Sequence, residues 1–200
     1  MILQDIINII ESVAPLSYQE SWDNSGLQVG DRNAEVHAAL LTVDVTESVV
    51  DEAIEKHCDL IISHHPLIFR GLKQITGSTT QERCIEKAIR HNIALYSSHT
   101  SMDVYLHGVS GKIADKLDII NYHILCPTTD DNVGLGVIGE LKTPMKSDDF
   151  IHFVQNIFDC SLRYIKPCDE NITTVAICGG AGAEFITQAI AQGADIYITA

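Results

Sequence analysis

The feature that most constrains the fold is a regular alternation of short apolar runs and amphipathic segments in the first half of the chain. Three apolar, β-branched runs at 38–43, 59–63 and 93–97 have the length of buried strands. Between them, 46–57 and 79–92 carry apolar side chains at helical spacing, and each opens with a Thr that can cap a helix. This order is typical of a parallel sheet covered by helices. The sequence therefore predicts an α/β fold with mainly parallel sheets.

The second half of the chain repeats part of this rhythm. Residues 38–63 align without a gap on residues 174–199, and both segments are predicted to form strand, turn, helix and strand. Asp59 falls on Asp195 in this alignment. Two explanations stay open at this point: an ancestral duplication, or the general likeness of any two β-α-β units.

We expect two related α/β lobes, 1–120 and 121–200. The second lobe stops at the tip of a predicted strand, 194–199, whereas the matching strand of the first lobe continues into a loop with two histidines. A buried strand whose tip is left uncovered is unusual. We therefore expect the second lobe to be incomplete at its C-terminus.

Composition and charge exclude several classes of protein. Of the 200 residues, 46% are hydrophobic and 20% charged, which is typical of a globular chain rather than a disordered one. The 27 acidic against 13 basic residues give a net charge of −14, which disfavours nucleic acids and anionic membranes as partners. No apolar run approaches the roughly 18 residues of a membrane helix.

The N-terminus and the cysteines bear on the compartment. The apolar N-terminal segment carries acidic residues and no basic flank, so it does not resemble a signal peptide. The six cysteines are dispersed without a C-x-x-C pair, which favours buried, reduced thiols over a disulfide framework or a zinc ribbon. We expect a cytoplasmic protein.

The residues that most directly suggest chemistry follow two neighbouring predicted strands. His64 and His65 come after the second strand, and His99 and Asp103 come after the third. In open α/β sheets, ligands bind at the carboxyl ends of the strands. Imidazole suits Zn, Mn, Fe or Ni, and a carboxylate can bridge two cations. Since adjacent side chains on a strand diverge, His64 and His65 would serve different ions of a close pair. The alternative is a structural loop in which both rings cap backbone groups.

Other segments carry weaker signals. Asp44 could orient a ligand histidine or cap the following helix. Residues 22–26 could line a cleft or form an Asx-type turn around a core Trp. The G-x-G-x-x-G match at 134–139 leads into a strand-like segment and Pro144, so it does not predict a dinucleotide site. Residues 179–182 could present amides to an anion or form a plain tight turn.

Several sequence blocks occur together in one order. They are 22–30 (WDNSGLQVG), 42–46 (TVDVT), 63–69 (SHHPLIF) and 96–103 (YSSHTSMD), followed by 134–141 and 175–182. In this order they resemble the Nif-three-like family of dinuclear-metal-centre proteins, also known as GTP cyclohydrolase I type 2 homologues. The resemblance spans essentially the whole chain.

The resemblance implies two related α/β lobes, a toroidal homohexamer and metal pairs that face an internal cavity. His64, His65 and Asp103 match the family's first metal ligands, and His99 matches a histidine close to the metals. Two divalent ions per chain are implied, and the sequence does not distinguish Zn, Fe, Mn and Ni. The family completes its site with a His and a Glu in a block beyond Ala200, and this sequence contains no such block.

Three functions remain open on the sequence. The first is a metal-dependent hydrolase, similar to a cyclohydrolase, that acts on a nucleotide or another phosphate-bearing small molecule, with His99 as the catalytic proton carrier. The second is a non-enzymatic metal-binding protein for regulation, storage or delivery. The third is an interaction module without metal, in which the histidines are structural.

Overall fold

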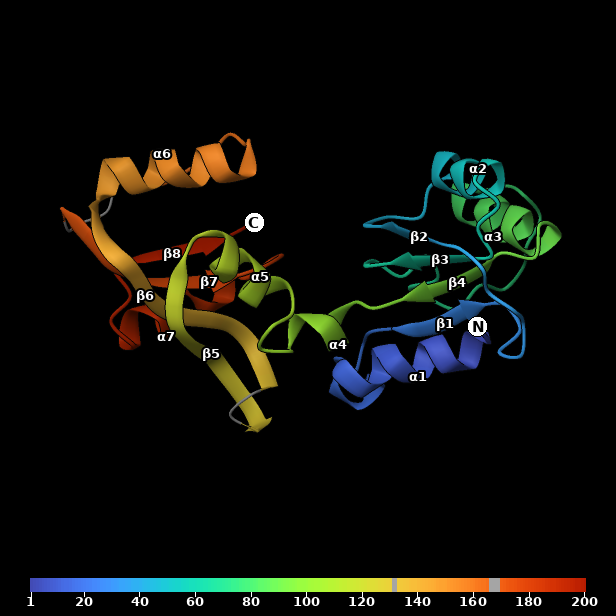
Figure 1. The fold of residues 1–200 in the computed structure, drawn as a ribbon, viewed down its shortest axis with the longest axis horizontal. Coiled ribbons are helices and arrows are strands. Elements are labelled where there is room, and N and C mark those ends of the chain that lie inside the picture. Colours follow the sequence, from blue (N-terminus) through green and yellow to red (C-terminus); the bar gives the residue numbers. More distant parts are fainter. Residues whose placement is uncertain (131–132, 166–169) are drawn as a thin grey trace. The chain divides into compact units, whose positions relative to one another are not determined.

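The computed structural model describes residues 1–130, 133–165 and 170–200 (Figure 1). The chain forms two compact units, Met1–Met102 and Asp103–Ala200. The unit boundary therefore lies earlier than the expected division after residue 120. The reason is that Ala114 and Leu117, from the segment expected in the first lobe, pack into the core of the second unit.

The first unit contains one four-stranded sheet with strand order β1-β4-β3-β2. β2, β3 and β4 are mutually parallel, and β1 runs antiparallel to β4. The expected strand–helix alternation is thus confirmed. Its elements are α1 (Leu3–Val13), η1 (Leu16–Tyr18), β1 (Gly26–Val29), β2 (Ala39–Thr42), α2 (Glu47–Glu55), β3 (Leu60–Ser63), α3 (Thr80–Arg90) and β4 (Ala94–Ser97).

Alternating side chains of this sheet face two different helix layers. Ile61 and Leu95 pack with the buried faces of α2 and α3, whereas Leu60 and Tyr96 pack with α1. Figure 1 shows α2 and α3 on one face of this sheet and α1 on the other. The period of two along a strand separates the two sets. β2 is an edge strand, so the expectation of a buried strand at 38–43 is wrong for Leu41, which is exposed.

Both helices that cover the second face begin where the sequence predicts. The Thr46 hydroxyl accepts a hydrogen bond from the Val49 N–H, and the Thr79 hydroxyl accepts one from the Glu82 N–H. Each bond satisfies one of the amides that a helix N-terminus leaves unpaired. These caps fix the loops that connect the strand ends to the helices.

The second unit contains a four-stranded sheet with strand order β5-β6-β7-β8. Only β7 and β8 are parallel, and the other two pairs are antiparallel. The elements are α4 (Thr100–Asp103), which crosses the unit boundary, α5 (Val109–Lys116), β5 (Ile119–Asp130), β6 (Val133–Lys146), α6 (Ser147–Phe158), β7 (Asn171–Cys178), η2 (Ala183–Phe185), α7 (Ile186–Ala191) and β8 (Ile196–Thr199).

The α/β class is confirmed, but mainly parallel pairing holds for the first sheet alone. β6 begins at Val133, directly after β5 ends at Asp130. A parallel pair needs a crossover of a dozen or more residues, so this connection allows only an antiparallel pair. The long β5–β6 pair is formed by a region of the chain in which the sequence shows no regular apolar pattern.

The parallel pairs of the two units share one register. Ala39 pairs with Leu60 in β2–β3, and the aligned Val175 pairs with Ile196 in β7–β8. Each unit also has an aspartate whose carboxylate accepts two neighbouring backbone N–H groups, an arrangement we call the aspartate clamp. Asp59 accepts the N–H groups of His37 and Ala38, and Asp195 accepts those of Thr173 and Thr174. A β-α-β topology does not require this clamp, so the structure favours the duplication.

Within the described residues, no helix is long and apolar enough to span a bilayer. The cysteines of these residues are free thiols, while Cys168 lies outside them. The expectation of buried thiols is wrong for Cys160, which is exposed just after the end of α6.

Candidate metal centre

Three histidines lie together at the carboxyl ends of two adjacent parallel strands. His64 and His65 follow β3, and His99 follows β4 by two residues. Ser63 pairs with Ser97 in the β3–β4 ladder, so both strands end at the same edge of the sheet. One potential ligand atom from each histidine lies within 4.8 Å of the other two.

The rings of His64 and His65 converge rather than diverge. Their centroids are 4.9 Å apart, and the His99 ring lies 5.2 Å from His64 and 5.6 Å from His65. The two residues have passed the end of β3, and their side chains no longer follow the alternation of a strand. All three imidazoles therefore contribute to one cluster.

The Nδ1 atoms of His64 and His65 are each held by an acceptor. His64 Nδ1 lies 3.1 Å from the Ser98 carbonyl oxygen, and His65 Nδ1 lies 2.8 Å from Asp44 Oδ1. A carbonyl or a carboxylate can only accept, so Nδ1 carries the hydrogen in both neutral rings. The lone pair is then on Nε2, which is the form that binds a metal ion.

Asp44 thus fulfils one of the two roles predicted for it. It orients a histidine of the cluster, while Thr46 caps the following helix instead. The side chains of His65 and Asp44 are 48% and 64% exposed, so this side of the cluster is open to water.

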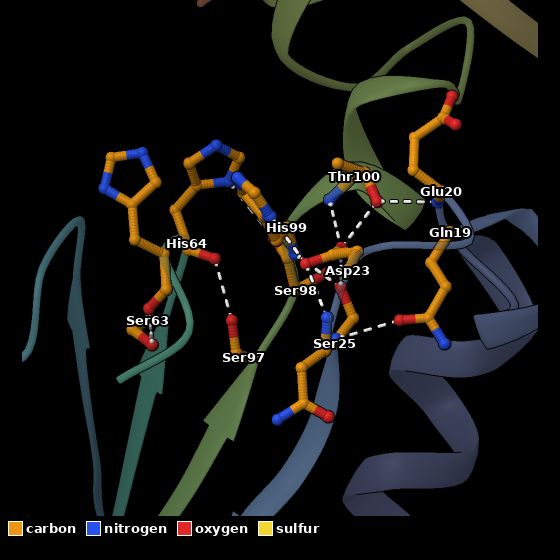
Figure 2. Close-up of polar contacts among 12 residues, drawn as sticks. Gln19, Glu20, Asp23, Ser25, Ser63, His64, Ser97, Ser98, His99 and Thr100 are labelled. Carbon is orange, nitrogen blue, oxygen red and sulfur yellow. Dashed lines mark hydrogen bonds and ion pairs between the residues drawn. The ribbon is translucent and has the colours of Figure 1, made fainter. Parts of the chain in front are cut away.

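His99 is held in the same way by a more deeply buried carboxylate. Its Nδ1 lies 2.8 Å from Asp23 Oδ1, a contact that Figure 2 shows as a dashed line. The Asp23 side chain is 0% exposed. The Asp23 carboxylate also accepts hydrogen bonds from the N–H and hydroxyl of Thr100, the Ser25 hydroxyl and the Asn24 N–H.

These bonds determine the charge of Asp23. Burial alone would raise its pKa, but the hydrogen bonds from Thr100, His99 and Ser25 outweigh it and lower the pKa of Asp23 to about 2. The carboxylate is therefore ionised near neutral pH and keeps the hydrogen on His99 Nδ1. By the same argument as for the other two rings, His99 Nε2 carries a lone pair.

Residues 22–26 therefore have a definite place in the site. Asp23 holds His99 across a separation of 76 residues, a partnership that no local pattern in the sequence signals. The alternative of a core Trp is wrong, because Trp22 is 58% exposed.

Asp103 is the fourth residue predicted for the site. It ends α4 and is the first residue of the second unit. The cluster of close ligand atoms consists of His64, His65 and His99. A ligand role for Asp103 stays a proposal.

Two glycine-containing segments have no such role. Residues 134–139 lie inside β6, so the G-x-G-x-x-G match opens no helix, as predicted. In the turn at 179–182, the Gly179 N–H donates to Ser110 Oγ and the Gly182 N–H donates to Thr199 Oγ1. These internal bonds favour the plain turn over an anion site.

The donor set fits a transition-metal ion. Zn–N bonds of about 2.0–2.1 Å in a tetrahedral site place two nitrogens on one ion about 3.4 Å apart. The ligand atoms of the cluster lie within 4.8 Å of one another, so the rings would move closer together to share one ion. Three imidazoles whose Nδ1 atoms face acceptors match the ligand chemistry of Zn, Fe, Mn or Ni.

The fold and the cluster define an α/β protein of two units with a histidine-rich candidate metal centre. The family model of Duf34/NIF3 (NGG1p interacting factor 3) matches residues 1–200. The chain belongs to the Duf34/NIF3 family, as the resemblance implied.

Similar proteins agree with this assignment. A GTP cyclohydrolase 1 type 2 homolog of Clostridium acetobutylicum is 38% identical over 98% of this chain and 75% of that protein. Among solved structures, a Bacillus cereus protein related to NIF3 superposes with a TM-score of 0.92, at 26% identity over 100% of this chain and 82% of the other. A Staphylococcus aureus protein has a TM-score of 0.91, at 31% identity over 100% of this chain and 79% of the other. The expected α/β class and Nif-three-like fold are confirmed.

Proposed function

We propose that this protein binds two divalent metal ions and is a metal-dependent hydrolase for a nucleotide or another phosphate-bearing small molecule. The observation that carries the proposal is the cluster of three histidines, each with its Nδ1 held by an acceptor. Such partners behind ligand histidines are typical of metal sites. The Clostridium acetobutylicum relative carries the name GTP cyclohydrolase 1 type 2 homolog, which is compatible with this proposal.

In this proposal, His64, His65 and Asp103 hold the ions. Divalent ions at this site would supply an activated water and polarise a phosphoryl or carbonyl oxygen. His99 is the catalytic residue that accepts and returns a proton at Nε2. Asp23 is its positioning residue, because the ionised carboxylate fixes the ring and stabilises the imidazolium that forms.

A second candidate function is a non-enzymatic metal-binding scaffold for regulation or delivery. It is favoured by the exposure of His65 and Asp44, because an ion held at an open edge exchanges readily. Both versions include the toroidal homohexamer, whose mass can be measured by sedimentation equilibrium.

The test of metal binding is the metal content per chain, measured by elemental mass spectrometry. We expect about two ions in the wild type and a loss in His65→Ala. The matched control is His91→Ala, because His91 is an exposed helix-end histidine outside the cluster. A wild type without metal would contradict the proposal. Tight metal binding without turnover of a panel of nucleotides and phosphoesters would favour the scaffold.

The role of His99 can be tested separately with His99→Gln. If His99 carries the proton, turnover falls while the metal content stays at the wild-type value. A loss of metal in this variant would show that His99 is a ligand, which the short distances within the cluster also permit.

A further inference from the structure

Two large aromatic side chains next to the histidine cluster are left open to solvent. Trp22 is 58% exposed and Phe69 is 41% exposed. Their ring centroids are 5.9 Å apart, and they lie 6.2 Å and 6.4 Å from the His99 ring. His99 is therefore the residue that joins the aromatic pair to the candidate metal centre.

This aromatic pair is held in place by hydrogen bonds around Ile68. The side-chain amides of Asn24 and Gln28 both donate to the Ile68 carbonyl oxygen, and Gln28 Oε1 accepts the Ile68 N–H at 2.9 Å. These bonds attach the loop that carries Phe69 to the segment that carries Trp22. The exposure of both rings is thus built into the site rather than the result of a loose loop.

The shape of the pair suits a flat ligand. The Trp22 and Phe69 rings are inclined by 56°, so they form two walls of a corner and not one flat surface. A planar ring can stack on one wall and meet the other edge-on, which are the two favoured arrangements of aromatic pairs. Small-molecule sites commonly combine such apolar walls with a few polar groups that fix orientation.

We propose that Trp22 and Phe69 bind the planar nitrogen heterocycle of the substrate, such as a purine base, beside His99. This inference rests on the proposed function and names the substrate class of the same site. The net charge of −14 gives no general attraction for anions, so stacking on the two rings supplies the affinity for the ring part. The phosphate-bearing part would face the histidines.

The chain offers its own reporter for the test. Trp22 is the sole tryptophan of the sequence, so its fluorescence reports on this corner alone. Guanosine 5′-monophosphate should quench the emission, and ribose 5-phosphate, which lacks the base, should not. Removal of one wall in Phe69→Leu should weaken binding by about 5- to 150-fold, the equivalent of about 1–3 kcal/mol. Tyr164→Leu, which removes an exposed ring of the second unit, is the control and should leave binding unchanged.

The outcomes separate this inference from the proposed function. We call the corner formed by Trp22 and Phe69 the ring site. Two results together would support it. The nucleotide quenches the emission while ribose 5-phosphate does not, and Phe69→Leu weakens this quenching without changing the metal content or the circular dichroism spectrum. Equal responses to both ligands would assign binding to the phosphate and overturn the inference. No response to the nucleotide in protein that holds its metal would overturn the ring site and leave metal binding intact. Quenching in protein that takes up no metal would support the ring site and refute the proposed function.

Discussion

Replacement of Asp23 by Asn should destabilise the metal-free protein at neutral pH. Asp23 Oδ1 accepts the Asn24 N–H at 2.7 Å, and Oδ2 accepts the Thr100 N–H at 3.1 Å. A backbone N–H can only donate, and one side of an asparagine amide is also a donor. Whichever way the new side chain turns, one backbone N–H, either the exposed Asn24 N–H or the part-buried Thr100 N–H, therefore faces another donor. An unsatisfied buried donor costs about 1–3 kcal/mol, and an exposed one costs less because water can bind it.

The pKa of Asp23, which the same hydrogen bonds lower, gives a second estimate of their contribution. It is lowered from 3.8 to about 2 in the folded protein, which corresponds to about 2 kcal/mol of stability. Because the folded pKa lies below the unfolded one, this stability is present above about pH 4. It is lost as the pH falls from about 4 to about 2.

The assay is urea unfolding of chelator-treated wild type and Asp23→Asn at a series of pH values. We expect the variant to be about 1–3 kcal/mol less stable at pH 7, with a difference that shrinks below about pH 4. The control is Asp44→Asn, whose exposed carboxylate contacts one histidine and should matter by less than about 1 kcal/mol. Equal stability of the wild type and the Asp23 variant at pH 7, or a difference independent of pH, would refute the reasoning.

Three further predictions concern the scaffold, and unfolding free energies check all of them. Gly134→Ala should destabilise the protein by more than about 3 kcal/mol, because the new Cβ would lie 2.1 Å from a carbonyl oxygen of β5. The control is Gly71→Ala, which has open space around it and should change stability by less than about 0.5 kcal/mol. If the duplicated aspartate clamp is structural in both units, Asp59→Asn and Asp195→Asn should each cost about 1–3 kcal/mol, and a neutral result in both would contradict that role. Loss of the α3 cap in Thr79→Ala should cost about 1 kcal/mol, and an unchanged unfolding midpoint would show that the cap contributes nothing.

Local chemistry explains which parts of the fold could be predicted. The strands and helices of the first unit follow from apolar runs and from the caps at Thr46 and Thr79, since both act over a few residues. The second sheet was harder because the strands of 119–130 and 133–146 are longer than their apolar runs. Their pairing is decided by the connection between them and by packing against β7, and neither is visible as a periodicity.

The candidate site divides in a similar way. The sequence by itself determined that histidines follow two adjacent parallel strands, because strand order and polarity place their carboxyl ends at one edge. Only the tertiary structure decided that Asp23 and Asp44 fix two of the rings, and that Trp22 and Phe69 stand beside His99. These contacts join residues far apart in the chain, so they form only when the loops that follow different strands pack against one another. Local sequence preferences act over a few residues and cannot specify such packing.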